Sequence, residues 1–150
     1  MQWLSKHPLL SVAGTLAIVV LGTFGNCLGE ATFLGSDSSV LRLPLLSDWQ
    51  HLWTIFSVDF MMFTEGQWRP SSYALIALLR NFVDPEDTLF WHSWFLSFHW
   101  FNAVLASSVA YHFSRSYSVA LVAGLVLAAH PLATVVVNDA GLFHHLLGLT

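Results

Sequence analysis

The chain has 150 residues, of which 55% are hydrophobic and only 9% are charged, whereas roughly a quarter of the residues in a soluble domain carry charge. The formal net charge is -4, and the five lysines and arginines are scattered, so the sequence lacks the basic stripe that nucleic-acid binding requires. The single cysteine, Cys27, excludes an internal disulfide. This composition predicts an integral membrane protein in contact with membrane lipids.

The first apolar run covers about residues 9–28, which is the length that a helix needs to cross a bilayer, about 20 residues. Lys6 supplies a positive flank, a feature that a cleaved signal peptide would share. However, the run is long and no small-x-small cleavage site follows it well. We therefore expect a retained transmembrane helix.

The loop at residues 29–88 contains two segments whose apolar residues recur at helical spacing. Ser47 or Asp48 is expected to cap the first helix. Ser71 or Ser72 is expected to cap the second, next to a proline that the first turn of a helix tolerates. Both segments are predicted to be amphipathic helices at the membrane surface. Their apolar stripes consist of Trp49, Leu52, Trp53 and Phe56 in the first and of Leu75, Leu78, Leu79 and Phe82 in the second.

Two further runs are long enough to cross a bilayer, at about residues 89–113 and 118–137. Arg115 lies in the short turn between them, and Lys6 precedes the first run. By the positive-inside rule these two ends are cytoplasmic, so the N-terminus is inside and the loop 29–88 is outside.

His130 and Pro131 interrupt the third run. The proline is expected to free the carbonyl of residue 127 and to kink or locally unwind the helix, which a membrane tolerates only against protein or water. Residues 140–150 are apolar but too short to span, so they form either an interfacial helix or part of a span. His144 and His145 point to different helix faces, which makes a metal shared between them improbable.

The whole chain, residues 1–150, is thus expected to be a single all-α, polytopic membrane domain with about three transmembrane helices and two interfacial helices. No metal site is predicted.

The second run is unusually aromatic and also carries polar side chains at membrane depth. His99 and Asn102 lie one turn apart, and His92 shares their helix face. Three uses remain open for these residues: hydrogen bonding to a neighbouring helix, ligation of a metal or a chlorophyll-type magnesium, and binding of a lipid donor. The residues expected to pack against a partner or a pigment are Trp91, His92, Trp94, Phe98, His99, Trp100 and Asn102.

Five stretches, in this order, resemble the N-terminal module of type C integral-membrane glycosyltransferases, most closely the tetratricopeptide-repeat O-mannosyltransferases. The stretches are "GEATFLGSD", "LWTIFSVDF", "QWRPSSY", "FHWFNAVLASSVAYHF" and "AAHPLATVVVNDAG", and the similarity covers about residues 20–148. In that family the fold is a polytopic helical bundle and the sugar donor is linked to dolichol or polyprenyl phosphate.

The resemblance implies roles for several residues. Asp37, in the first outer loop, would be a general base. Arg69, beside Trp68, would hold a phosphate or a lipid headgroup, and His130 would help to frame the donor. Asn138 and Asp139 would mark the outer end of the third helix, beside an outward cavity. A purely structural interpretation is also open for Asp37, as a turn residue or N-cap, and for Arg69 with Trp68, as interfacial anchors.

The chain also departs from the family pattern. Ser36 and Asp37 replace a usual acidic pair, and Ala140-Gly141-Leu142 replaces a segment with a basic residue. Three spans also cannot easily enclose both a polyprenyl groove and an acceptor site. We therefore expect a small non-catalytic integral membrane subunit that packs into or stabilises a larger membrane complex of other integral membrane subunits. A pigment–protein or photosynthetic complex, with (bacterio)chlorophyll contacts, is one such partner. The alternative is a glycosyltransferase, or a fragment of one, that uses a polyprenyl-phosphate sugar.

Overall fold

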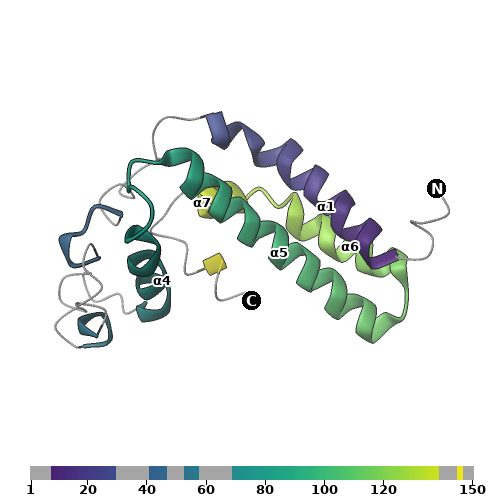
Figure 1. The fold of residues 1–150 in the computed structure, drawn as a ribbon. Helices are drawn as coiled ribbons and strands as arrows, with labels where there is room; N and C mark the ends of the chain where they lie inside the picture. The colour runs from purple at the N-terminus through teal and green to yellow at the C-terminus, as the bar shows by residue number, and fades with distance from the viewer. Residues whose placement is uncertain (1–7, 30–40, 47–52, 58–68, 139–144, 147–150) are drawn as a thin grey trace.

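The structure, a computed structural model, describes residues 8–29, 41–46, 53–57, 69–138 and 145–146. Within these ranges every regular element is a helix and there is no strand, which confirms the all-α prediction. Three helices lie side by side in an elongated bundle, and a further helix packs at one end of it (Figure 1).

The first bundle helix, α1 (Pro8–Phe24), continues directly into a 3-10 turn, η2 (Gly25–Gly29). Together they form an apolar helix, Leu9–Gly29, of 21 residues with a mean hydropathy of 1.8. Among the described residues it is the one helix that is long and apolar enough to cross a membrane, as judged by length and composition. Its bounds agree with those expected for the first run.

The central helix, α5 (Thr88–Ser114), has 27 residues and matches the helix expected at 89–113. It begins at Asp87, whose Oδ1 accepts a hydrogen bond of 3.0 Å from the backbone N–H of Phe90, so the side chain satisfies one of the unpaired donors of the first turn. It ends at Arg115, which adopts the left-handed backbone conformation (φ 54°) common just after a helix.

The third run is not one continuous helix. It forms α6 (Tyr117–Ala128) and the short α7 (Ala133–Asn138), with a turn at residues 129–132 between them. The expected local unwinding at His130–Pro131 is therefore confirmed, and it divides the run into two helices. The cause is Pro131, which has no N–H and whose ring excludes the carbonyl four residues earlier. The carbonyl of Leu127 is nevertheless satisfied, because it accepts a hydrogen bond of 3.3 Å from the N–H of His130.

The helix expected after Pro70 is α4 (Pro70–Arg80), with the proline in its first turn. Its N-cap is Arg69, not Ser71 or Ser72, because the helix begins one residue before the first serine. The Oγ of Ser72 instead donates to the Arg69 carbonyl, 3.0 Å away.

The other expected surface helix lies mostly outside the described residues. Here the structure shows two short 3-10 turns, η3 (Pro44–Leu46) and η5 (Thr54–Phe56).

Helix α5 links two apolar cores. One core lies between α1, α5 and the α6–α7 segment. The other packs the first turns of α5, through Trp91 and Phe95, against α4, η3 and η5. Helices α1 and α6 run in the same direction and α5 runs opposite to both (Figure 1). The start of α1 and the α5–α6 turn consequently lie at one end of the bundle, and α4 lies at the other.

The contact between α5 and α6 is especially close at Gly124. A Cβ atom on this glycine would collide with the Oγ of Ser107 and with the side chain of Leu16. Three helices therefore meet at a position where only a glycine fits.

Candidate binding site

Two buried polar residues of α5 hold other segments of the chain. His99 and Asn102 are each 2% exposed. His99 Nε2 lies 3.2 Å from the carbonyl oxygen of Ala128, at the end of α6, and Asn102 Nδ2 donates a hydrogen bond of 2.8 Å to the Leu146 carbonyl. Both acceptors are backbone oxygens at places where a helix is interrupted or short. For these two residues the hydrogen-bonding alternative is confirmed.

Two more side chains of α5 bind backbone carbonyls of neighbouring helices. The Oγ of Ser107 donates to Ala120 of α6, 2.8 Å away. The indole N–H of Trp100 donates to Ala13 of α1, 2.9 Å away. Helix α5 therefore holds α1, α6 and the C-terminal segment at Leu146 through four separate hydrogen bonds.

A cavity of about 150 Å³ lies where α6 stops and α7 begins. Three histidines line it: His99 from α5, His130 from the turn, and His145. The remaining lining is apolar and comes from the end of α6, the start of α7 and Leu146. Because His130 is exposed and His99 is buried, the cavity reaches from the surface into the bundle.

The hydrogen bonds of His99 and His130 determine which nitrogen of each ring is already used and which remains for a further partner. A carbonyl oxygen can only accept, so Nε2 of His99 carries its proton and donates to Ala128, which leaves Nδ1 as the second ring nitrogen. In His130 the order is reversed, because Nδ1 accepts from the backbone N–H of Leu132, 3.2 Å away, and Nε2 carries the proton. The ring of Phe24 packs edge-on against His99, with ring centroids 5.3 Å apart, and restricts its rotation.

The three histidines do not form a metal centre. Within the part of the chain that the structure describes, no group of three or more His, Cys, Asp or Glu side chains is arranged to hold a metal ion. His144 lies outside that part.

The residues assigned to a donor site through the family resemblance are only partly described. Asp37, Trp68 and Asp139 lie outside the described residues, and of Asn138 only the backbone, as the last residue of α7, is described. His130 lines the cavity, whereas Arg69 precedes α4 and is not among the lining residues.

Arg69 acts electrostatically on its own helix. Burial raises the pKa of the Tyr73 hydroxyl, and the positive charge of Arg69 opposes that rise.

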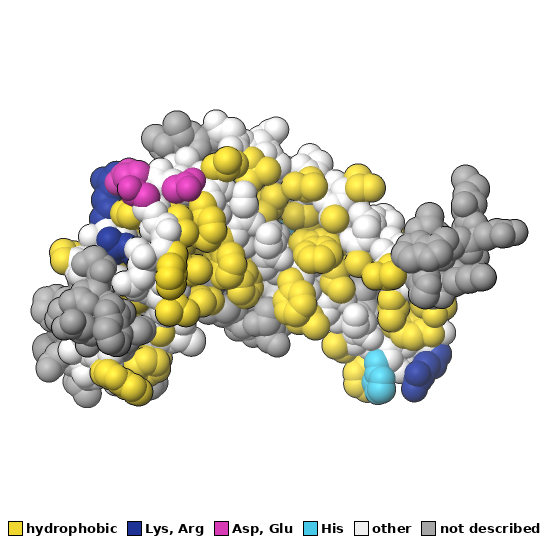
Figure 2. All heavy atoms as spheres, viewed as in Figure 1, with side chains coloured by type: hydrophobic (Ala, Val, Ile, Leu, Met, Phe, Trp, Pro, Cys, Tyr) yellow, Lys and Arg dark blue, Asp and Glu magenta, His cyan; other side chains and the backbone are white. Residues whose placement is uncertain are grey.

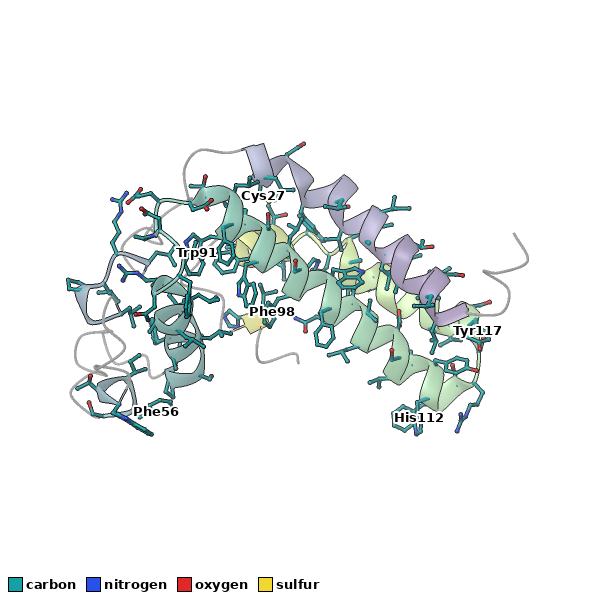
Figure 3. The ribbon with its side chains drawn as sticks, in the orientation of Figure 1. Cys27, Phe56, Trp91, Phe98, His112 and Tyr117 are labelled. Atoms are coloured by element: carbon teal, nitrogen blue, oxygen red, sulfur yellow. The ribbon has the colours of Figure 1, made fainter. Side chains whose placement is uncertain are left out.

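The aromatic residues expected to face a partner or pigment divide into two groups. Trp91 and His92 are almost fully buried within the chain, and the indole N–H of Trp91 donates to the Asp84 carbonyl, 3.0 Å away. Trp94, Phe98 and Trp100 are half-buried, so each keeps part of its surface accessible. Phe98 is labelled in Figure 3. Trp94 and Phe98 contact each other, with ring centroids 5.2 Å apart.

Sequence reasoning missed two features of this region. His145 and Leu146 contribute to the cavity, although their segment was expected only to lie at the membrane interface or to span it in part. A second, larger cavity of about 230 Å³ lies between α1 and α5 and is lined on α5 by Ser93, Ser97 and Trp100. The four-residue spacing of the two serines, which puts them on one helix face, is a signal that could have indicated it.

Comparisons of the chain with protein-family models, with curated proteins and with solved structures gave no match in any of the three. The assignment of a function therefore depends on the geometry described above and on the sequence.

Proposed function

We propose that this chain is a multi-pass integral membrane protein in which α1, α5 and the α6–α7 unit cross the bilayer. Residues 8–29, 88–114 and 116–138 contain no Asp, Glu, Lys or Arg. At 1.5 Å per residue, α5 is about 40 Å long, more than the roughly 30 Å hydrocarbon core of a bilayer. Helix α6 alone is too short, but α6 and α7 together form a broken span whose irregular backbone is covered by α5.

The surface of the bundle supports this proposal. Many of its outward side chains are large and apolar, and they form patches over the visible face of the bundle in Figure 2. In water extensive apolar surface is unfavourable, whereas in a membrane it contacts acyl chains or other helices. The exposed residues include Leu10, Ile18 and Leu21 of α1, Phe101, Val109 and Phe113 of α5, and Val119, Val122 and Val126 of α6.

The charges at the two ends give the orientation. Arg115 lies in the α5–α6 turn, at the same end as the start of α1, which follows Lys6 in the sequence. At the opposite end, near α4, acidic side chains lie beside basic ones (Figure 2), and Arg42 forms an ion pair with Glu86. The short α5–α6 turn carries Arg115 and no acidic residue, so by the positive-inside rule we place the N-terminus in the cytoplasm and α4 outside.

Helix α4 and the turn η5 form an apolar platform at the outer end. Leu78 and Phe82 are exposed at the end of α4, and Trp53 and Phe56 are exposed at η5. Aromatic residues favour the headgroup layer, where their rings meet both lipid and water. The platform therefore lies at the outer surface of the membrane.

Within this framework the chain serves as a non-catalytic subunit that packs into a larger membrane complex. One observation carries the proposal. Four polar side chains of α5 each donate a hydrogen bond to a backbone carbonyl of a neighbouring segment: His99, Trp100, Asn102 and Ser107. These polar groups hold the bundle together and leave its outer faces apolar, which suits a module that other membrane helices contact.

Purification of the native protein in mild detergent, with mass spectrometry and absorbance of what accompanies it, tests this proposal. Stoichiometric recovery of other integral membrane subunits is expected, with visible absorbance if the partner carries pigment. Recovery of the chain alone, with no partner after cross-linking in the intact membrane, would contradict it.

A second function, a glycosyltransferase with a polyprenyl-phosphate sugar donor, is supported by the position of His130. This residue, which the family resemblance relates to the donor, lines a cavity together with a buried histidine. The test is Asp37→Asn: sugar transfer from a polyprenyl-linked donor should be lost in the variant while purification with partners is kept. If the native protein shows no sugar-transfer activity, this second function is excluded.

A further inference from the structure

The cavity at the α6–α7 break offers two opposite hydrogen-bonding groups. His130 has used Nδ1 as an acceptor for Leu132, so the nitrogen that remains for a ligand is Nε2, a donor. His99 has used Nε2 as a donor to Ala128, so the nitrogen that remains is Nδ1, an acceptor when the ring is neutral. Both residues line the same cavity of about 150 Å³. His130 and His99 therefore contribute one donor and one acceptor to the cavity, beside the third lining histidine, His145.

This pairing discriminates between classes of ligand. A carboxylate or a phosphate only accepts hydrogen bonds and would meet the unprotonated nitrogen of His99, while an ammonium group only donates and would meet the N–H of His130. A hydroxyl group both donates and accepts, so it matches a donor and an acceptor at once. Apart from His145, the rest of the lining is apolar, which favours a hydrocarbon chain beside that hydroxyl.

We propose that this cavity binds the hydroxyl group of a neutral amphiphile, an alcohol attached to an apolar chain. The hydroxyl donates to Nδ1 of His99 and accepts from Nε2–H of His130, and the chain lies against the apolar walls at the end of α6 and the start of α7. The proposal depends on the cavity alone and is independent of whether the protein belongs to a larger complex.

Two substitutions remove the ligand-facing nitrogens while keeping the structural hydrogen bonds. In His130→Asn the amide oxygen occupies the position of Nδ1 and accepts from Leu132, but nothing replaces Nε2. In His99→Gln the amide N–H occupies the position of Nε2 and donates to Ala128, but nothing replaces Nδ1. His112→Asn is the matched control, because His112 is exposed near the far end of α5 and does not line the cavity (Figure 3).

The experiment uses a photoreactive octanol that carries a diazirine, with the full-length protein in lipid nanodiscs. Labelled positions are mapped by mass spectrometry, and the comparison ligand is the methyl ether of the same molecule, which accepts hydrogen bonds but cannot donate them. We expect label in residues 127–133, reduced at least fivefold by excess 1-octanol, by His130→Asn and by His99→Gln. The His112→Asn protein should be labelled like the wild type, and the ether should label at least fivefold less.

Equal labelling by the alcohol and its ether would show that the cavity admits only hydrocarbon or water, and would overturn the proposal. So would label that is unchanged in His130→Asn, a substitution at an exposed position that the fold tolerates. The proposal would also be overturned if the wild type carried no label at residues 127–133 while other parts of the bundle were labelled.

Discussion

The side-chain amide of Asn102, in the middle of α5, donates a hydrogen bond of 2.8 Å to the backbone carbonyl of Leu146, 44 residues further along the chain. This contact, together with the packing of the Leu146 side chain in the apolar core, attaches the segment at Leu146 to the bundle. Both residues are 2% exposed, so no water replaces the bond when it is lost.

Replacing Asn102 with leucine should therefore destabilise the protein. The substitution keeps the volume of the side chain but leaves the Leu146 carbonyl buried without its donor, which costs about 1 kcal/mol for a hydrogen bond between membrane segments and up to about 3 kcal/mol for a buried orphan group. Unfolding by denaturant in mixed micelles measures the change. Ser108→Ala is the control, because Ser108 bonds the carbonyl of Val104 on its own helix, and it should change stability by less than about 0.5 kcal/mol. Equal effects of the two substitutions would contradict the role of Asn102.

Gly124 should not tolerate a methyl group. A Cβ atom there collides with Ser107 and Leu16, so Gly124→Ala should cost about 1–3 kcal/mol, the usual range for overpacking. Gly22→Ala is the matched control, because nothing lies within 4 Å of a Cβ at that position of α1. Alanine is the better helix former by up to about 1 kcal/mol, so Gly22→Ala should be neutral or stabilising. The same unfolding measurement compares the two, and a Gly124→Ala protein as stable as the wild type would show that α5 and α6 are less closely packed than described.

If the platform at the outer end of the bundle lies at the membrane surface, Phe82 should lie at the depth of the lipid headgroups. This side chain is 82% exposed at the end of α4. An environment-sensitive fluorophore on Phe82→Cys, in a Cys27→Ser background, should emit as in the headgroup layer and be quenched by lipids brominated near the headgroup. The same fluorophore on Asp87→Cys, at the N-cap of α5, serves as the control and should report water more strongly. A water-like emission spectrum at both positions would show that the platform does not lie in the headgroup layer of the membrane.

Part of the fold was readable from local sequence. Asp87 and Arg115 bound a long stretch without charges, and the structure places a helix between them. Pro131 predicted the interruption of the third run because proline lacks the N–H that a continuous helix needs. Hydrogen bonding to a neighbouring segment is one of the three uses that the sequence leaves open for His99 and Asn102, and it is the one that the structure shows.

The rest depends on contacts between distant parts of the chain, which leave no local signal. Nothing near Leu146 indicates that its carbonyl meets Asn102, and nothing near His145 indicates that it shares a cavity with His99 and His130. Capping also misled the local analysis: Ser71 and Ser72 resemble N-caps, but Pro70 already has helical geometry, so the helix begins before them. Trp91 has the composition of an interfacial aromatic, yet packing against α4 buries it completely.

The central claim is that α5 crosses the bilayer and separates the α4 end of the bundle from the α5–α6 turn. The most direct test is the accessibility of single cysteines, in a Cys27→Ser background, to a membrane-impermeant maleimide added to sealed vesicles of known orientation. Glu86→Cys should react only from the outside, Ser116→Cys should react only from the cytoplasmic side, and Val122→Cys, in the middle of α6, should react from neither side. Reaction of Glu86→Cys and Ser116→Cys from the same side would contradict the account.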